Sequence, residues 1–304
     1  MKVIFIQSSV AASTQLSKIR LSLLSLIVMT GLAANTANAA LASQVLPVKY
    51  HAGQYCPSDM KAFVPKGTAH KNFVADISCM RQQLQAYQAE HQPINTRFQA
   101  YKADAWLSYV GHEDSEASLT KAGHYALNEA LSILEALKTN QVDKLPLTAD
   151  IPPTSGLQRP DLWASLLTIK QTPAFTPLVK TVADSEVKLI WAEAEFCEFG
   201  WRHSREHYSA ADRWVATAEL TALNTSGVDK QSFNGLKTQY LARLKPLAGP
   251  KDSKQSCRGA VLPYIELPKV GITEPSSQPL PLPVVPVASP PIELNSAFKP
   301  TIVG

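Results

Sequence analysis

A proline-free stretch at residues 178–223 is the feature that most constrains this chain. Its apolar residues recur at the three- and four-residue spacing of an α-helix, and alanine, the best helix former, is frequent. Gly200 interrupts the pattern, and a glycine inside a helix costs about 1 kcal/mol relative to alanine. Gly200 therefore marks either a break between two helices or a point where another backbone comes close.

Several polar residues of this stretch lie near its apolar stripe. Glu186, Glu193, Gly200 and His207 are spaced seven apart, which places them on the buried side of a helix. Buried acids must be paired or hydrogen-bonded, because an unpaired buried charge costs several kcal/mol. The expected cationic partners in this stretch are Arg202, His203 and Arg205. Both a structural network of ion pairs and a ligand site fit this pattern.

Five further segments carry helical periodicity and are separated by prolines or short polar breaks. They are residues 72–90, 94–110, 118–138, 160–169 and 229–244. Two-residue alternation of apolar and polar side chains, the pattern of a half-buried strand, does not occur convincingly between turn signals. The sequence therefore predicts an all-α protein built as an antiparallel helical bundle.

The first 39 residues resemble a secretory signal peptide. Lys2, Lys18 and Arg20 precede an apolar core and an Ala-Asn-Ala cleavage site at residues 37–39. The core is shorter than the roughly 20 apolar residues of a membrane span, which favours cleavage over a retained membrane anchor. We therefore expect a periplasmic protein without a transmembrane segment after cleavage. Cleavage lowers the net charge from +4 to +1, so no basic footprint for nucleic acid remains.

The rest of the chain divides by composition into two parts. Residues 40–247 contain the predicted helices and form the expected bundle domain. Residues 248–304 include nine prolines between Pro268 and Pro300, so we expect a disordered or polyproline II tail. Such a tail can act as a spacer across the envelope, as a partner-binding segment, or only as a terminal linker.

Four cysteines remain after the predicted cleavage, namely Cys56, Cys79, Cys197 and Cys257. An even number of cysteines in an exported protein indicates two disulfides, and three pairings are open. A four-cysteine zinc site would need C-x2-C pairs, which the sequence lacks.

Two blocks of residues resemble the helical region that precedes OmpA-like peptidoglycan-binding domains in bacterial outer-membrane proteins. The first block consists of Lys102, Ala103, Trp106, Leu107, His112 and Glu113. The second consists of residues 161–164, 186–187 and 189–192, Glu195, Glu198 and residues 200–203. The likeness covers about residues 101–218, and the GWRH run at 200–203 is its most specific part.

The resemblance implies a helical module, a proline-rich linker and then a peptidoglycan-binding domain. Residues 292–296 look like the start of such a domain, and the sequence ends shortly after them. In that family, wall anchoring belongs to the domain that follows the linker. The resemblance thus implies a cell-envelope protein, associated with the outer membrane, and assigns no activity to the helices.

A short motif offers a zinc site as an alternative. The run HSREH matches H-x-x-E-H, in which His203 and His207 face one way on a helix and Glu206 lies near as a base. A zinc hydrolase needs a third ligand, and the candidates downstream of the motif are Glu219 and Glu266. In the family, GWRH is followed by proline and tyrosine, so His207 falls outside the resemblance.

The polar residues of the two blocks form a second candidate site. They are Lys102, His112, Glu113, Glu186, Glu195, Glu198, Arg202 and His203. Glu195, Glu198 and Arg202 are three and four residues apart, so one helix would place them on one face. With His112 and Glu113 alongside, the cluster could bind a metal, a glycan or a peptide; a buried structural network is the alternative.

The five tryptophans at helical spacing are expected to pack in the core rather than to line a sugar-binding groove. They are Trp106, Trp163, Trp191, Trp201 and Trp214.

The sequence contains no phosphate loop, nucleophile elbow or convincing nucleophilic triad, so no catalytic residue is assigned. The leading prediction is a non-enzymatic envelope protein that acts as a structural or interaction module. It needs no cofactor, and its partners are envelope proteins or peptidoglycan. The alternatives are a zinc-dependent hydrolase and a module that binds a metal or a small ligand.

Overall fold

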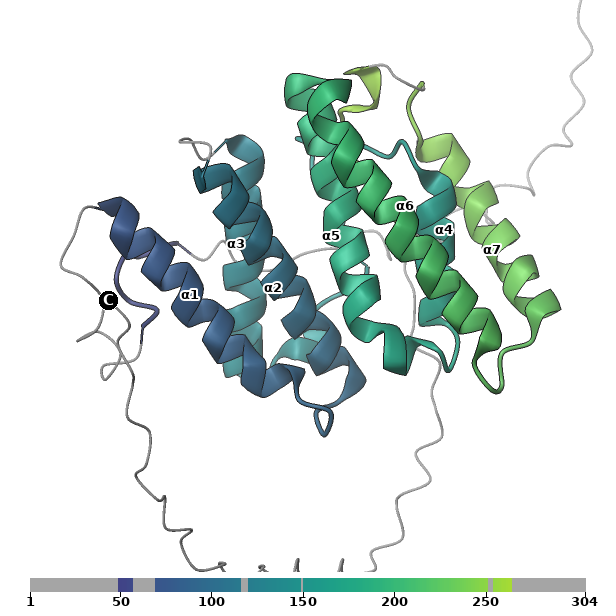
Figure 1. The fold of residues 1–304 in the computed structure, drawn as a ribbon, viewed down its shortest axis with the longest axis horizontal. Coiled ribbons are helices and arrows are strands. Elements are labelled where there is room, and N and C mark those ends of the chain that lie inside the picture. Colours follow the sequence, from purple (N-terminus) through teal and green to yellow (C-terminus); the bar gives the residue numbers. More distant parts are fainter. Residues whose placement is uncertain (1–48, 57–68, 116–119, 149, 251–253, 264–304) are drawn as a thin grey trace, which may run out of the picture. The chain divides into compact units, whose positions relative to one another are not determined.

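The computed structural model describes residues 49–56, 69–115, 120–148, 150–250 and 254–263, all within one compact unit. These residues form seven α-helices and no β-strand, which confirms the all-α prediction (Figure 1). The helices are α1 (Ala69–Gln88), α2 (Ile94–Ser115), α3 (Lys121–Lys138), α4 (Pro160–Lys170), α5 (Phe175–Phe199), α6 (Trp201–Asn224) and α7 (Lys230–Leu244). The expected signal peptide and most of the expected tail lie outside the described residues.

The helices pack mainly against their neighbours in sequence, as in a bundle. Helix α2 contacts α1, α3 and α5, while α5 also packs along α6 (Figure 1). Helix α4 lies against α5, α6 and α7 and is buried from Leu162 to Lys170. A helix buried on nearly all sides carries few charged residues, and α4 has only Asp161 in its first turn and Lys170 at its end. None of the described helices combines the length and the apolar character that a membrane span requires.

Local signals in the sequence explain where several helices begin. Thr120 caps α3, because its hydroxyl accepts a hydrogen bond of 3.1 Å from the Gly123 backbone N–H. Asp229 caps α7 in the same way, at 2.7 Å from the Ser232 N–H. Helix α4 begins at Pro160, which occupies the position where proline costs no hydrogen bond.

Gly200 separates α5 from α6, so the central stretch is two helices joined by a single residue. Its backbone has φ +86° and ψ −172°, a region that is nearly restricted to glycine. A Cβ atom at Gly200 would meet no atom within 4 Å, so the reason for glycine is backbone conformation and not space. Of the two interpretations left open by the sequence, the helix break is correct.

We expect Gly200→Ala to lower the free energy of unfolding by about 1–3 kcal/mol, the cost of holding a side-chain-bearing residue in this region. The matched control is Gly235→Ala in α7, where a Cβ also meets nothing within 4 Å but the backbone is helical. That control should raise stability by up to about 1 kcal/mol. Equal effects of the two substitutions in urea unfolding would show that the Gly200 conformation is not required.

All four cysteines are paired, as the sequence predicts, and the structure selects one of the three pairings. Cys56 bonds to Cys79 on α1, and Cys197 at the end of α5 bonds to Cys257. The second bond joins residues 60 apart in sequence and so ties the segment 254–263 to α5.

Residues 254–263 contact the helices, although they were assigned with the tail by composition. Ile151 and Ala260 exchange backbone hydrogen bonds of 2.9 and 3.0 Å, and Leu262 is 6% exposed. The Ser256 hydroxyl donates to the Glu193 carboxylate at 3.0 Å. The described part of the tail therefore continues the packed unit beyond residue 247.

Candidate functional site

A buried ion cluster lies where α2, α4 and α5 meet. Lys170 and Glu186 are fully buried and form an ion pair, and Lys170 also donates to the Leu147 carbonyl. The Lys102 ammonium lies 3.7 Å from the other oxygen of Glu186 and is itself 2% exposed. Burial lowers the pKa of Lys170 to about 8, against the opposing effect of Glu186. Glu186 is thus paired inside the bundle, by lysines rather than by the cations of 202–205.

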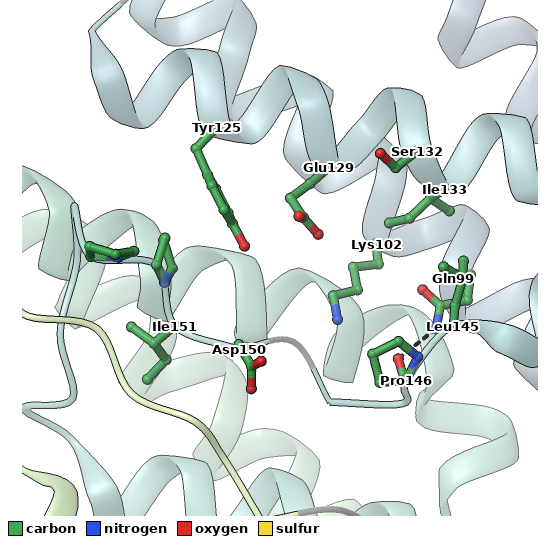
Figure 2. A pocket seen from close by; sticks show the side chains of 12 residues that line it. Gln99, Lys102, Tyr125, Glu129, Ser132, Ile133, Leu145, Pro146, Asp150 and Ile151 are labelled. Atoms are coloured by element: carbon green, nitrogen blue, oxygen red, sulfur yellow. Dashed lines mark hydrogen bonds between the residues drawn. The ribbon is translucent and has the colours of Figure 1, made fainter. Parts of the chain in front are cut away.

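A pocket of about 240 Å³ adjoins this cluster, between α2, α3 and the loop after α3 (Figure 2). Tyr125, Glu129 and Ser132 face it because they are four and three residues apart on α3. Gln99 and Lys102 reach it from α2. The remaining wall is apolar apart from Asp150 and consists of Ile133, Leu145, Pro146, Asp150, Ile151, Pro152 and Pro153.

The pocket brings one buried ammonium near two acidic side chains. Figure 2 shows Tyr125 and Glu129 extending from α3, and Lys102 from α2, toward the loop that carries Asp150. Burial raises the pKa of Glu129, while Lys102 and a hydrogen bond from Tyr125 oppose that effect. Burial also raises the pKa of Asp150, again opposed in part by Lys102. With both acids ionised, the Lys102 ammonium neutralises only one of the two carboxylates, and the three groups together carry a net negative charge.

The loop wall of the pocket is held by the segment that follows α7. Asp150 accepts a hydrogen bond of 3.4 Å from the Leu262 N–H, next to the Ile151–Ala260 backbone pair. The same segment is fixed to α5 by the disulfide at Cys257. Gln99 of α2 donates to the carbonyl of Pro146 in this loop at 2.9 Å. These contacts hold the wall in place, so the pocket is pre-formed.

A second cluster lies further along the α2–α5 interface, about 15 Å from Lys102 by the rise of a helix. It brings together His112 of α2, Glu195 of α5 and His207 of α6, with candidate ligand atoms all within 4.8 Å of one another. Glu195 is 4% exposed and His207 is 6% exposed. Three separate helices therefore supply two imidazoles and one carboxylate to one place.

Trp191 organises this second cluster. Its ring stacks on Tyr109 at 4.6 Å and on His207 at 4.4 Å between centroids, and its indole N–H donates to Glu195 at 3.2 Å. The Lys188 ammonium lies 3.7 Å from the indole centroid and 3.3 Å from His207 Nδ1. Burial, with a further contribution from Lys188, lowers the pKa of His207 to about 4, so its imidazole is neutral at pH 7.

Glu193 is buried on another face of α5, where two hydroxyl groups donate hydrogen bonds to it. Tyr208 donates to one of its oxygens, and Ser256 donates to the other at 3.0 Å. Burial raises the pKa of Glu193 to about 7, although Ser256 and Gln158 oppose the shift by hydrogen bonding. Close packing surrounds it, because a Cβ on Gly156 would lie 3.0 Å from a carboxylate oxygen of Glu193. Glu193 therefore acts as a buried, hydrogen-bonded carboxyl that links α5 to the segment 254–263.

The remaining residues of the predicted cluster do not join either site. Glu113 accepts a hydrogen bond from the hydroxyl of Thr120, the residue that caps α3. Burial raises the pKa of the nearby Glu198 carboxyl, and the Glu113 charge adds to that effect. Arg202 and His203 are exposed. Because α5 ends at Phe199, the single helical face expected for Glu195, Glu198 and Arg202 does not form.

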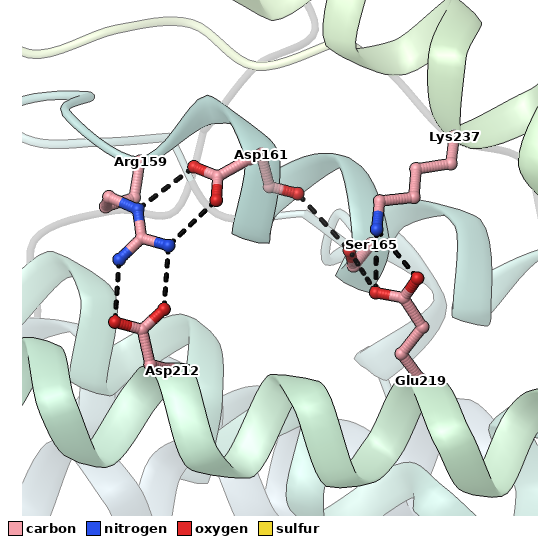
Figure 3. A network of polar contacts seen from close by, with 6 residues as sticks. All are labelled: Arg159, Asp161, Ser165, Asp212, Glu219 and Lys237. Atoms are coloured by element: carbon pink, nitrogen blue, oxygen red, sulfur yellow. Dashed lines mark hydrogen bonds and ion pairs between the residues drawn. The ribbon is translucent and has the colours of Figure 1, made fainter.

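The H-x-x-E-H residues are not gathered into a metal site. His207 is buried, whereas His203 is exposed and contacts the ring of Phe199 at 5.1 Å, and the Glu206 side chain is 74% exposed. The suggested third ligand Glu219 instead pairs with Lys237 at 2.7 Å (Figure 3). Glu266 lies outside the described residues.

Figure 3 shows that Glu219 belongs to a polar network between α4, α6 and α7. Ser165 of α4 donates to Glu219 at 2.9 Å. Arg159 binds both Asp161 and Asp212 through paired hydrogen bonds of 2.7 to 3.0 Å. These contacts lock α4 to α6 and leave no role for Glu219 near His207.

Sequence reasoning missed three residues of the buried ion cluster and of the pocket beside it. Lys170 ends the buried run of α4, in which no other charged residue follows Asp161, and a lone lysine in such a run is a signal for a buried ion pair. Glu129 repeats at four residues from Tyr125, which marks a helix face without revealing what it meets. Asp150 lies in a proline-rich loop and carries no signal in the sequence.

Of the tryptophans, Trp106, Trp163 and Trp191 are buried as expected. Trp201 and Trp214 are 57% and 38% exposed, so the expectation of a core position is wrong for these two.

No protein-family model, no curated protein and no solved structure matches this chain.

Proposed function

We propose that this chain is a non-enzymatic protein of the bacterial cell envelope, exported to the periplasm, whose helical module binds an aliphatic ammonium group. The binding site is the pocket between Lys102, Tyr125, Glu129 and Asp150. The ammonium belongs either to a free amine or to a side chain of an envelope peptide. The two disulfides support an oxidising compartment outside the cytoplasm.

The observation that carries the proposal is the charge arrangement around the pocket. Two carboxyl groups, on Glu129 and Asp150, face a cavity in which burial raises the pKa of each. Lys102 is already paired with Glu186, so it balances these acids only in part. A bound ammonium would supply the missing positive charge and donate hydrogen bonds to both carboxylates. A cavity of this kind with a few convergent polar groups is the usual form of a small-ligand site.

Size and wall chemistry narrow the ligand further. A volume of about 240 Å³ lies below the roughly 300–1,000 Å³ of sites for drug-sized molecules. The apolar wall formed by Ile133, Leu145 and Ile151 suits a short alkyl chain. The ligand class is therefore a short aliphatic amine, such as cadaverine or the side chain of lysine.

The test is a calorimetric titration of the mature chain, residues 40–304, with cadaverine and separately with lysine near neutral pH. We expect saturable binding that Glu129→Gln weakens by about tenfold to about 100-fold, the value of one charge-assisted hydrogen bond. The matched control is Glu135→Gln, an exposed residue on the same helix, which should bind as the wild type does. Absence of binding by the wild type at millimolar amine would reject the proposal.

A second arm separates the two sources of the ammonium group. Purified peptidoglycan is mixed with the wild type and with Glu129→Gln and then sedimented at modest salt. Wall peptide as the source predicts that the wild type sediments and that the variant stays in the supernatant. A free amine as the source predicts that both stay in the supernatant while cadaverine still binds.

A further inference from the structure

We infer that His112, Glu195 and His207 form a binding site for a divalent transition-metal ion of the zinc type, separate from the amine pocket. The three residues come from α2, α5 and α6, so a bound ion would join three helices. This site shares one residue, His207, with the H-x-x-E-H motif at residues 203–207. Its other two ligands come from other helices.

The ligand chemistry suits such an ion. Imidazole nitrogens favour zinc, copper, nickel and iron, and two histidines with one glutamate are a recurrent zinc set that leaves a position for water. The ligand atoms lie within 4.8 Å of one another, while a tetrahedral zinc with bonds of about 2.0–2.1 Å needs them about 3.3 Å apart. The ligand atoms therefore have to approach one another by at most about 1.5 Å, a distance within reach of side-chain rotation at the partly exposed His112.

The surroundings already orient two of the three ligands. Trp191 donates its indole N–H to one oxygen of Glu195 at 3.2 Å, the type of outer contact that fixes a ligating carboxylate. The same indole stacks on the ring of His207 and contacts His112 edge-on at 4.8 Å. Trp191 thus touches all three ligands, which limits their motion before an ion arrives.

Without a bound ion, the ammonium group of Lys188 is the positive charge next to His207. This ammonium lies over the face of Trp191 and donates to His207 Nδ1 at 3.3 Å, one of the two imidazole nitrogens that could bind an ion. An ion and this ammonium repel each other at such distances, so they compete for the site. Lys188 is half-buried and is attracted by Glu206 of α6, which gives the side chain a direction in which to withdraw.

Among the described residues, one other group of potential metal ligands does not form a metal site. Glu193 lies near Cys197 and Cys257 with comparable spacing. Both sulfurs are consumed in the disulfide, so no thiolate is available to bind a metal.

The test measures zinc binding to the untagged, disulfide-intact mature chain by calorimetry and by metal analysis after dialysis. We expect about one zinc ion per chain, with affinity reduced more than about 100-fold in His112→Ala and in Glu195→Gln, since even outer-shell changes cost about 10- to 100-fold. Lys188→Met should raise the affinity at least about tenfold by removing the competing charge. His203→Ala is the control and should bind as the wild type does, because His203 is exposed and outside the site.

Each outcome decides the inference. Loss of zinc in His203→Ala to the same extent as in His112→Ala would overturn it in favour of the sequence motif. Absence of zinc from both the wild type and Lys188→Met would also overturn it. Circular dichroism and thermal unfolding of every variant separate loss of a ligand from loss of the fold. The amine titration of Lys188→Met should match the wild type, so failure of this site and failure of the pocket are distinguishable.

Discussion

Replacing Lys170 by methionine is expected to destabilise the protein by about 3–5 kcal/mol, the usual cost of removing one partner of a buried ion pair. Lys170 and Glu186 are both fully buried, and the lysine also satisfies the Leu147 carbonyl. Without it, Glu186 keeps only Lys102 at 3.7 Å as a charged partner. The measurement is the free energy of unfolding in urea, monitored by circular dichroism.

The control for this prediction is a lysine–aspartate ion pair that lies closer to the solvent. Lys180 pairs with Asp184 one turn later on α5, and the lysine side chain is 59% exposed. Lys180→Met should change stability by less than about 1 kcal/mol, because exposed pairs contribute little. The double variant Lys170→Met with Glu186→Leu should recover part of the loss, since it removes the unpaired Glu186 carboxylate and leaves Lys102 near Glu129 and Asp150. Equal effects of Lys170→Met and Lys180→Met would contradict a dry interior at this pair.

Stability is expected to fall as the pH rises from about 5 to about 8, and Glu193 is expected to cause a large part of the fall. Its pKa is raised from 4.5 to about 7 in the folded protein. Between these values the folded state holds a proton that the unfolded state has released, so raising the pH favours unfolding. The difference corresponds to about 3 kcal/mol over this window.

Glu193→Gln isolates this contribution, because the amide stays neutral, keeps one oxygen that accepts from one of the two hydroxyls of Tyr208 and Ser256, and offers its NH2 group to the other hydroxyl as a donor. The variant should lose about 3 kcal/mol of pH dependence and exceed the wild type in stability at about pH 8. Glu135→Gln, at an exposed position of α3, should retain the wild-type slope. A wild-type slope in Glu193→Gln would show that Glu193 ionises normally inside the bundle.

The helices were predictable because periodicity and caps act over a few residues. The run 94–110 was expected to be helical and lies within α2, and the helix expected at 160–169 is α4 with one residue more. The burial of Glu186 and Glu193 also followed from their spacing and is confirmed. Each of these inferences used only local sequence.

Partners between helices were not predictable, because they depend on how the helices are placed in space. Glu186 was expected to find its cations on its C-terminal side, but Lys170 comes from α4 and Lys102 from α2. Gly200 explains why Arg202 does not reach Glu186, because the backbone at Gly200 turns α6 away from the line of α5 and leaves Arg202 exposed. Asp150 faces the pocket only because the segment after α7 holds its loop.

The most direct test of the proposed function is a crystal structure of the mature chain grown with cadaverine. The proposal predicts an amine nitrogen in the pocket within about 2.7–3.2 Å of the carboxylates of Glu129 and Asp150, with the alkyl chain against Ile151. A pocket that closes through a direct contact of Lys102 with Glu129, with no amine bound at millimolar cadaverine, would contradict it.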